Sequence, residues 1–416
     1  MEKVYETYKD SGAEWIGEIP KGWKIKKMKW ITSIKRGASP RPIADPKYFD
    51  DENGEFSWVR IADVSASERY LLETKEKLSE LGASLSVKRY PGDFFLSIAG
   101  SVGKPIITKI KCCIHDGFVW FPELKINPEF LYYIFQSDLP FGGLGKVGTQ
   151  LNLNTETIGN IQIPDISDDD INSIVNYLDY KTGLIDAIIA QKEALIKKLK
   201  EQRQAIINEA VTKGLNKDVK LKDSGIEWLG EIPEHWEVAK FKYFAKIKNG
   251  KDQKNVLKED GLYPVLGTGG EFGRASEFLY DKPSVLLGRK GTIDKPQFIE
   301  EPFWTVDTLF YTEIQEDVIP KYLFFLSTII PFNLLQESSA VPSMTQDKLH
   351  NVFFTKPIKE EQNKIVKHIE NEMDKMDLLI SKANESIKKL KEYRQSLISE
   401  AVTGKVDVRD WQAPKS

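Results

Sequence analysis

The side chains of this sequence that could carry out chemistry are scattered, and their spacing matches no known catalytic site. A catalyst needs titratable groups that converge on one place. The chain has four histidines, which stand apart and lack metal-ligand spacing: His115, His235, His350 and His368. The glycine segment 100–104 is too short for a phosphate-binding P-loop and is followed by Pro105. Cys112 and Cys113 are adjacent, which fits neither a disulfide framework nor a zinc site, so we interpret them as small buried residues. We therefore expect no catalytic residue, no metal and no cofactor on this chain.

Basic residues interleaved with tryptophan form a pattern that could bind a ligand. The segment 21–41 holds eight Lys or Arg and no acidic residue, with Trp23 and Trp30 among them. The corresponding segment 240–254, later in the chain, holds six Lys and one Asp. One such run would fit a solvated protein surface equally well. Its recurrence favours a strand and turn that face the phosphates of a nucleic acid.

Base edges have to be read by other groups, and polar or basic side chains on glycine-rich loops are the candidates. An arginine on such a loop could pair bidentately with guanine. Each candidate could also be an ordinary turn residue, so the prediction concerns the loops more than any one side chain. The residues that we expect to contact DNA are Lys35, Arg36, Arg41, Ser101, Lys104, Thr149, Gln150, Asn152, Lys248, Lys251, Arg289, Lys290, Thr292, Lys295, Ser343 and Gln346.

The basic segments recur because the chain is two copies of one unit. The stretch KDSGAEWIGEIP at 9–20 returns as KDSGIEWLGEIP at 222–233, with ten of twelve residues identical and an offset of 213. The stretch KKLKEQRQAIINEAVT at 197–212 returns at 388–403 with twelve of sixteen identical and an offset of 191. The offsets differ by 22 residues, so the first copy carries a longer insert between Gly37 and Gly100.

Each copy has two parts that differ in their residue pattern. Short apolar runs separated by Gly, Pro and Asn indicate strands and turns, with a helical piece around 128–136. Ser167 and Asp170 then resemble a helix cap, and the stretch to about residue 213 has no proline. The predicted fold class is α/β (α+β), with two globular mixed-sheet domains in pseudo-two-fold tandem, separated by two long coiled-coil helices. We place the domains at 1–166 and 215–358, with opening motifs at 9–23 and 222–236, the helices at 167–214 and 359–404, and a C-terminal tail at 405–416.

Apolar residues in the two long stretches recur at alternate spacings of three and four, which is a heptad pattern. One such stripe would fit an ordinary amphipathic core helix. Two stripes, each closing one copy of the repeat, favour helices that pack on one another, and roughly 45 residues would span on the order of 65 Å. The predicted seam consists of Ile185, Ile188, Leu195, Leu199 and Ile206 on the first helix and Met376, Leu379, Leu390, Tyr393 and Leu397 on the second.

Composition limits the class of protein. The chain has 416 residues, of which 41% are hydrophobic and 29% charged, as in soluble globular proteins of two or three domains. The sequence has no apolar run long enough to cross a membrane and no apparent signal peptide, so we expect the protein in the cytoplasm. The net charge of -3 does not exclude nucleic acid as a partner, because basic residues can gather on one face.

Taken in order, the motifs resemble the specificity (S) subunit of type I restriction-modification systems over essentially the whole chain. SGAEWIGEIPKGW and SGIEWLGEIPEHW resemble the opening of that family's target recognition domains, and LKEQRQAIINEAVTKG and LKEYRQSLISEAVTGK resemble its conserved helical regions. The resemblance implies that each recognition domain reads one half of a split double-stranded DNA target, while the paired helices run antiparallel as a spacer and dock two modification subunits. It also implies that S-adenosylmethionine, ATP and Mg belong to the modification and restriction subunits, and that this chain has no catalytic activity.

The two copies differ where bases would be read. Arg289 and Lys290 of the second copy stand where the first has Ile98 and Ala99. We therefore expect an asymmetric DNA target, unlike the palindrome that a true dimer reads. Two alternatives remain open: a self-contained DNA methyltransferase or nuclease with fused recognition domains, and a coiled-coil scaffold that binds protein and does not read DNA.

Overall fold

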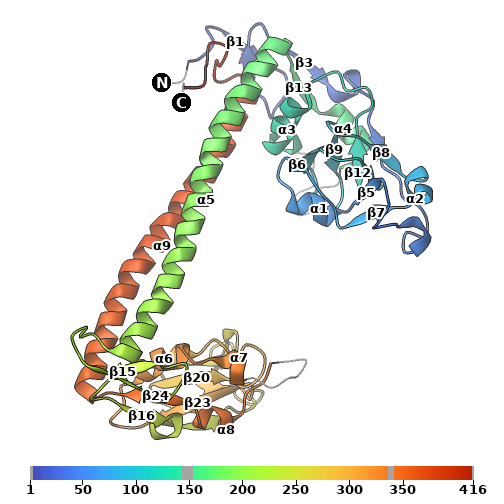
Figure 1. The fold of residues 1–416 in the computed structure, drawn as a ribbon. Coiled ribbons are helices and arrows are strands. Elements are labelled where there is room, and N and C mark those ends of the chain that lie inside the picture. The colour runs from blue at the N-terminus through green and yellow to red at the C-terminus, as the bar shows by residue number, and fades with distance from the viewer. Residues whose placement is uncertain (1–2, 143–152, 336–341, 415–416) are drawn as a thin grey trace. The chain divides into compact units, whose positions relative to one another are not determined.

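The computed structural model describes residues 3–142, 153–335 and 342–414, and it divides into two compact units. Unit 1 comprises Met1–Gln191 and Glu385–Ser416, and unit 2 comprises Lys192–Asn384. Each unit holds one mixed-sheet domain and about half of each long helix (Figure 1). The chain divides in this way because each domain shares a hydrophobic core with the helix halves beside it.

The domain of unit 1 contains two sheets that mix parallel and antiparallel strands. Its strands are β4 (Lys35–Arg36), β5 (Phe56–Val59), β6 (Tyr70–Leu71), β7 (Glu76–Leu78), β8 (Val87–Arg89), β9 (Phe94–Ser97), β10 (Pro105–Thr108), β11 (Cys112–Ile114) and β12 (Phe118–Trp120). One sheet has the order β4-β12-β9-β10-β6 and the other β7-β5-β11-β8. The pairs β10–β6 and β11–β5 are parallel, and the remaining pairs are antiparallel.

Short helices cover the sheets of unit 1. They are η1 (Met28–Trp30), η2 (Pro46–Tyr48), α1 (Ile61–Ala66), α2 (Glu80–Ser84), α3 (Pro128–Gln136), η3 (Leu139–Phe141) and α4 (Thr155–Asn160). The α3 helix confirms the helical piece predicted at 128–136. It begins there because the Asn127 side chain accepts a hydrogen bond from the Glu129 amide at 2.8 Å, and Pro128 suits the first turn. It packs against β10 with its large apolar residues fully buried.

The domain of unit 2 repeats this plan with fewer strands. They are β17 (Ala245–Asn249), β18 (Tyr263–Gly267), β19 (Gly270–Ala275), β20 (Ser284–Gly288), β21 (Gln297–Ile299), β22 (Trp304–Thr305) and β23 (Leu309–Ile314). One sheet has the order β17-β23-β20-β21 and the other β19-β18-β22. The helices are η4 (Phe241–Tyr243), α6 (Pro320–Thr328), α7 (Phe332–Leu335) and α8 (Gln346–His350), and α6 packs on β20 and β21 as α3 packs on β10.

The repeated opening motifs form hairpins followed by a two-stranded sheet. In unit 1 these are β1 (Tyr8–Asp10) with β2 (Glu18–Pro20), and β3 (Lys24–Lys27) with β13 (Gln162–Asp165). In unit 2 they are β14 (Leu221–Asp223) with β15 (Glu231–Pro233), and β16 (Glu237–Lys240) with β24 (Phe353–Lys356). Both hairpins end in a buried tryptophan, Trp23 or Trp236.

Each of these tryptophans covers the C-terminal end of a long helix. Gly404 and Gly214 follow the two helices with φ of +72° and +75°, a conformation that favours glycine. A Cβ on Gly404 would lie 2.9 Å from the Trp23 ring, and one on Gly214 would lie 3.1 Å from the Trp236 ring. The opening motif is therefore a packing element that closes each helix end.

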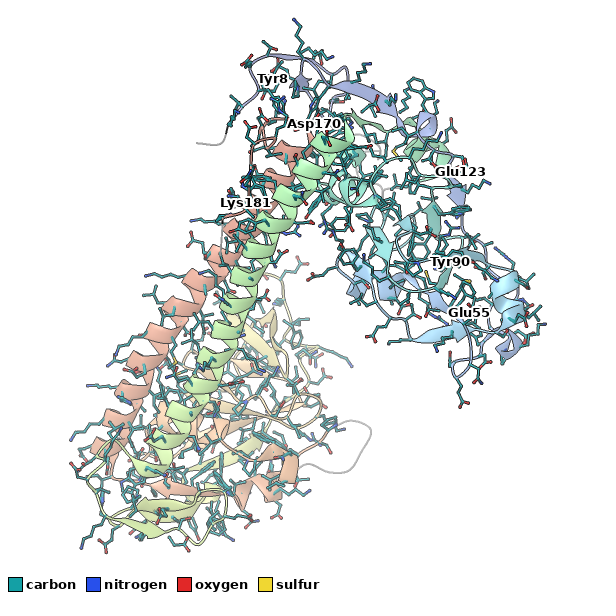
Figure 2. The ribbon with its side chains drawn as sticks, turned by 45° about the horizontal axis from the view of Figure 1, so that its top comes forward. Tyr8, Glu55, Tyr90, Glu123, Asp170 and Lys181 are labelled. Atoms are coloured by element: carbon teal, nitrogen blue, oxygen red, sulfur yellow. The ribbon has the colours of Figure 1, made fainter. Side chains whose placement is uncertain are left out.

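The long helices are α5 (Asp168–Lys213, 46 residues) and α9 (Lys359–Val402, 44 residues). The predicted cap of α5 is confirmed: the Ser167 hydroxyl accepts from the Asp170 amide at 3.1 Å and donates to the Asp170 carboxylate at 2.7 Å. Figure 2 labels Asp170 in this first turn. Within each unit the two helices run side by side and antiparallel (Figure 1), which together with the mixed sheets confirms the predicted fold class.

Two ion pairs link α5 and α9, one in each unit. Arg394 pairs with Asp186 in unit 1 through contacts of 2.9 and 3.3 Å. Arg203 pairs with Asp377 in unit 2 at 2.9 Å. The residue numbers of both pairs add to 580, so the helices keep one antiparallel register in both units. The pairs are also related by the repeat offset of 191, which makes the helix contact pseudo-symmetric.

Part of the predicted helix seam is wrong. Four of its residues are exposed, by 42, 48, 51 and 51% respectively: Ile188, Leu195, Leu379 and Tyr393. In each case the seam continues through the next residue, as at Ile189, which is buried. Starting from Ile185 and from Met376, the seam positions follow one another at intervals of four and then three residues. The predicted seam used intervals of three and then four. At three of the four positions the adjacent residue is also apolar, so both phases fit the sequence there, and only the opposing helix selects one.

The other predicted seam residues are buried or half-buried, and their place in the seam stays a prediction. Ile185, Leu199, Met376 and Leu397 are buried, and Ile206 and Leu390 are half-buried. At the corrected seam positions the polar residues Arg203 and Arg394 supply the two ion pairs described above. The tail that was set apart at 405–416 begins within the core of unit 1, where Val406 and Val408 are buried.

Candidate nucleic-acid interface

Three separate segments of unit 1 meet at one end of the strands in its five-stranded sheet. Strand β4 ends there, β12 begins there and β9 ends there, because β12 is antiparallel to both neighbours. The Gly37 amide donates to the Phe118 carbonyl at 2.9 Å, and the Ile98 amide donates to the Gly117 carbonyl at 2.8 Å. We call segments 35–41, 98–104 and 115–117 loop edge 1.

Unit 2 forms the same edge from equivalent strands. The Gly250 amide donates to the Leu309 carbonyl at 3.0 Å, and the Arg289 amide donates to the Thr308 carbonyl at 2.8 Å. A fourth segment joins here, since Lys290 forms a β-bridge with Ser343. We call segments 248–252, 289–295, 306–308 and 342–346 loop edge 2.

Loop edge 2 brings together predicted contact residues that are far apart in sequence. The Gln346 side-chain amide donates to the Asn249 Oδ1 at 3.1 Å, which links the end of β17 to the start of α8. Lys248, Lys251, Lys290 and Lys295 are exposed there, whereas the other predicted residues are half-buried: Arg289, Thr292, Ser343 and Gln346. Lys248 also contacts Glu313 at 3.5 Å, an exposed ion pair of small energetic weight.

The first glycine of each edge allows two backbones to approach closely. A Cβ on Gly37 would lie 2.2 Å from the His115 carbonyl oxygen, and one on Gly250 would lie 2.0 Å from the Val306 carbonyl oxygen. Any larger residue would push the basic segment away from the neighbouring turn. The glycines thus fix the basic residues beside the turns at 115–117 and 306–308.

At loop edge 1 the basic side chains gather on Asp116. The Arg36 Nε donates to the Asp116 carbonyl at 2.5 Å, and an Arg41 Nη2 lies 3.4 Å from the Asp116 carboxylate. Lys35 is exposed on the same strand end. The edge therefore presents two arginines on Asp116 with exposed Lys35 on the neighbouring strand end, a positive surface that an anion can approach.

His115 precedes Asp116 in this turn and is half-buried. Its ring packs on Trp58 and Phe118, with ring centroids 5.7 and 4.7 Å away, and the Gly117 amide donates to its Nδ1 at 2.9 Å. Burial lowers the pKa of His115, although neighbouring Asp116 acts in the opposite direction. His115 therefore packs as a support for the edge.

Two predicted contact residues have internal partners. The Lys104 ammonium donates to the Ser65 and Ser67 carbonyls at 3.0 and 2.5 Å, and burial lowers its pKa. The Ser101 and Ser65 hydroxyls lie 2.6 Å apart. Both residues attach the 98–104 loop to the end of α1, and contact with DNA stays a prediction for each of them. Thr149, Gln150 and Asn152 lie outside the residues that the structure describes.

The metal-ligating side chains of the described residues do not gather in one place. Among residues 3–142, 153–335 and 342–414, no group of three or more His, Cys, Asp or Glu residues could hold a metal ion. Cys112 and Cys113 are buried, as expected, and burial raises the pKa of each thiol to about 12. Over the same described part of the chain, no helix is long and apolar enough to span a bilayer.

Sequence reasoning missed the junction between the unit 1 domain and its long helix. Arg69 contacts Glu129 of α3 at 3.0 Å and Asp179 of α5 at 2.6 Å. The rings of Tyr70, Tyr132 and Tyr133 surround its guanidinium, with centroids 5.5, 5.0 and 4.6 Å away. Burial alone would lower the pKa of Arg69, but the hydrogen bond to Asp179 and the nearby charges raise it above its usual range.

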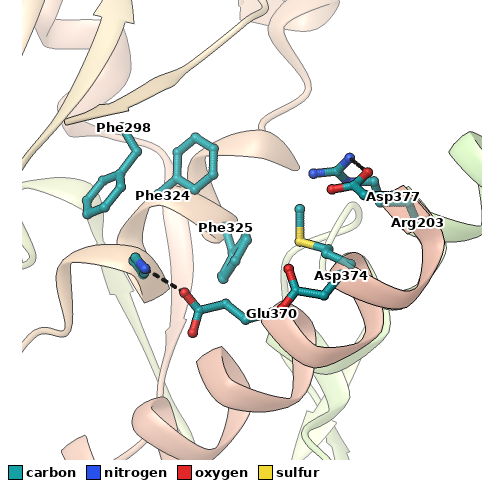
Figure 3. Close-up of a pocket in the computed structure, with 9 residues that line it drawn as sticks. Arg203, Phe298, Phe324, Phe325, Glu370, Asp374 and Asp377 are labelled. Carbon is teal, nitrogen blue, oxygen red and sulfur yellow. Dashed lines mark hydrogen bonds and ion pairs between the residues drawn. The ribbon is translucent and has the colours of Figure 1, made fainter. Parts of the chain in front are cut away.

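Unit 2 has a different junction at the equivalent place. Lys321 of α6 pairs with Glu370 of α9 at 2.6 Å. Beside this pair lies a pocket of about 210 Å³, lined by Arg203, Phe298, Lys321, Phe324, Phe325, Glu370, Met373, Asp374 and Asp377 (Figure 3). The close-up shows phenylalanine rings on one side of the pocket and acidic side chains of α9 on the other.

Known proteins resemble this chain over both copies of the repeat. The family model for the type I restriction modification DNA specificity domain matches residues 233–389. A Methanocaldococcus jannaschii type I restriction enzyme MjaIX specificity subunit is 26% identical over 60% of this chain and 58% of its own length. A putative MjaX specificity subunit of the same organism is 24% identical over 95% of this chain and 96% of its own length.

A solved structure has the same fold. A chain from a structural study of complex assembly and conformational transition of the type I R-M system superimposes with a TM-score of 0.72. The two chains are 16% identical, and the match covers 93% of this chain and 99% of the solved one. The matched domain model, the relatives aligned along the chain and the twice-repeated plan of sheet domain and long helix make this chain similar to type I restriction-modification specificity subunits, and residues 233–389 match their DNA specificity domain.

Proposed function

We propose that this chain selects the DNA sequence on which a type I restriction-modification complex acts, with loop edge 1 reading one half-site and loop edge 2 the other. One observation carries the proposal: the same sheet edge in both copies gathers basic side chains from distant segments. The framework of the edge is repeated, whereas the side chains on it differ. Two edges of one frame with different side chains suit a bipartite, asymmetric target.

The side chains of each edge divide into two roles. Lys35 and its counterpart Lys248 are exposed at the ends of β4 and β17, where they suit phosphate contacts that place the domain on DNA. The loops beyond them carry the residues that differ between the copies, which suits base reading. The binding of DNA therefore depends on salt through the lysines and on sequence through the loops.

The chain acts by recognition, and catalysis belongs to its partners. Two modification subunits that carry S-adenosylmethionine dock on the helices and methylate the selected site. Restriction subunits add ATP- and Mg-dependent cleavage. The relatives are named as specificity subunits of restriction enzymes, which supports this division of labour. A complex of this kind works on DNA in the cytoplasm.

The experiment that tests the function is a map of methylated bases in the genome with and without the gene. We expect an asymmetric bipartite motif with a gap of fixed length, present only with the gene. A perfect palindrome would contradict the proposal, and so would an unchanged map. Crosslinking of radioactive S-adenosylmethionine to the isolated chain would show instead that the chain has its own methyltransferase site.

The helices test the spacer role separately. Removing 191–197 together with 383–389 keeps the paired residue numbers in register and preserves the heptad. Each helix becomes shorter by roughly 10 Å, so the accepted gap should shrink by about three base pairs. Both half-sites should stay the same in the methylation map, and a changed half-site would refute the spacer role. Removing 191–197 alone is the control that breaks the register.

A further inference from the structure

Two arginines from unrelated positions hold the same backbone carbonyl in the two copies. Asp116 and Asp307 are equivalent in the repeat, and each lies in the turn before the central strand of its edge. The Asp116 carbonyl accepts from Arg36 Nε at 2.5 Å, and the Asp307 carbonyl accepts from Arg289 Nη1 at 3.2 Å. Each edge thus fixes one guanidinium at its centre.

The arginines reach this carbonyl from different strands. Arg36 ends β4, and its counterpart at the end of β17 is Asn249. Arg289 follows β20, and its counterpart after β9 is Ile98. The sequence alignment of the copies therefore pairs each arginine with an uncharged residue, and only the fold shows that they occupy the same place.

The anchoring bond uses one part of each guanidinium and leaves paired donors. Arg36 is held by Nε, so its Nη1 and Nη2 groups remain side by side. Arg289 is held by Nη1, so its Nε and Nη2 groups remain side by side. Either pair of parallel N–H groups matches the O6 and N7 acceptors of guanine. Among the described residues neither guanidinium has another hydrogen-bond acceptor.

The anchor is a neutral carbonyl, so neither arginine loses its charge to it. The Asp116 carboxylate is occupied by the Ser39 hydroxyl at 3.5 Å and by Arg41 at 3.4 Å. Arg36 is exposed and Arg289 is half-buried, so both can be reached by a ligand. Fixing a long side chain before binding lowers the conformational entropy lost on contact, which favours a reading group over a loose phosphate contact.

We propose that Arg36 and Arg289 are specificity-determining residues, each pairing with one guanine in the half-site of its own domain. The proposal rests on the proposed function, because it assumes that the loop edges meet DNA. It adds that each half-site is read by an arginine that is held on the equivalent backbone carbonyl of its domain. Since the remaining donors are different parts of the two guanidinium groups, the guanine need not stand at the same distance from the modified base in both halves.

The test uses the full complex with the variants Arg36→Lys and Arg289→Lys. Lysine keeps the positive charge but lacks the two parallel donors. Each variant should lose preference for guanine at one position of one half-site, by about 5- to 150-fold, the range of one bidentate pair. The two variants should affect different half-sites, and the untouched half-site shows in the same map that the subunit is folded.

Two further variants separate base reading from charge. Lys248→Ala should weaken binding evenly across sequences and reduce its dependence on salt, without relaxing any base. Arg274→Ala removes an exposed arginine that pairs with Glu271 in unit 2 and should leave the motif unchanged.

The outcomes are distinguishable. Relaxation at one guanine in a different half-site for each arginine variant supports the proposal. An even loss of binding with an unchanged motif shows that the arginines contact phosphate, and an unchanged map shows that they contact neither; both results overturn it. If the unaltered protein yields no bipartite motif, the proposed function fails first, before either arginine is in question.

Discussion

The two copies attach their sheet domains to the long helices by different means. Asp179 in unit 1 and Glu370 in unit 2 are equivalent in the repeat, and each receives a cation from the domain beside it. In unit 1 the cation is Arg69, which lies between Gly37 and Gly100, where the first copy is 22 residues longer than the second. In unit 2 it is Lys321 of α6, whose counterpart in α3 is the buried Phe130.

The surroundings of the two cations also differ. The Arg69 side chain is 16% exposed and lies among three tyrosine rings, whereas the Lys321 side chain is 37% exposed beside an open pocket. The acidic position on the helix is thus retained, while its partner and the packing around it have diverged. The two copies can therefore differ in how tightly each sheet domain is attached to its long helices while the fold stays the same.

The largest expected effect is the loss of the unit 1 junction. Arg69→Ala would leave Glu129 and Asp179 without their cation and remove packing from the tyrosine rings. Breaking such a part-buried network should lower the free energy of unfolding of unit 1 by about 2–4 kcal/mol. Urea unfolding of the full chain, followed by hydrogen exchange of peptides from each unit, would measure this loss.

The matched variant is Lys321→Ala in unit 2. The Lys321–Glu370 pair is more than one third exposed, so its removal should lower the free energy of unfolding by only about 0–1 kcal/mol. Equal losses from the two variants would show that the aromatic surroundings of Arg69 add nothing, and the comparison of the junctions would fail. Arg60→Ala, which removes an exposed pair with Glu76, serves as the surface control in unit 1.

A smaller effect is expected from the two helix ion pairs. Arg394 grips Asp186 through two nitrogens and its side chain is 19% exposed, whereas Arg203 holds Asp377 through one nitrogen and is 35% exposed. Double-mutant cycles with alanine should give a coupling of about 1 kcal/mol for the first pair and about 0.5 kcal/mol for the second.

The reverse order of the two couplings would contradict the view that unit 1 is the more tightly fastened unit. Both couplings should also weaken as salt is raised, since exposed charges are screened. A coupling that did not respond to salt would point to packing of the arginine stems as its source.

The repeat in the sequence predicted the architecture well because both copies repeat its signals. The cap at Ser167, the helix at 128–136 and the apolar stripes of the long helices depend on local patterns in the sequence, whereas the antiparallel pairing was implied by the family resemblance. The positions of the loop edges could also be predicted, since glycines and basic residues recur together in both copies. The phase of the helix seam could not be predicted, because adjacent residues such as Ile188 and Ile189 are both apolar. Only the opposing helix distinguishes them.

Two features depended on contacts that no local pattern encodes. Arg69 and Asp179 are 110 residues apart, and Arg69 lies in the insert, where the second copy offers no guide. A signal did exist on the helix, since an acidic residue stands at both 179 and 370. The equivalence of Arg36 and Arg289 was hidden for the opposite reason: the alignment of the copies pairs each with a different residue, and only the fold shows that they bind equivalent carbonyls, of Asp116 and Asp307.

The smallest expected effect concerns pH and distinguishes the two loop edges. His115 in unit 1 stands where unit 2 has Val306. Burial lowers the pKa of His115 in the folded protein, with Asp116 opposing and Arg60 reinforcing the shift, so the unfolded chain binds the proton more readily. The stability that neutral His115 allows is therefore present above the ordinary histidine pKa of about 6.5 and is lost as pH falls through it toward the lower folded value. Urea midpoints of unit 1 between pH 7.5 and roughly 5, read by pulse labelling of β11 and β12 peptides, should fall more steeply than in His115→Val, which carries the residue of the second copy. Parallel slopes for the two proteins would mean that His115 takes up its proton in the folded state as easily as in the unfolded chain, and loop edge 1 would then be no more sensitive to acid than loop edge 2.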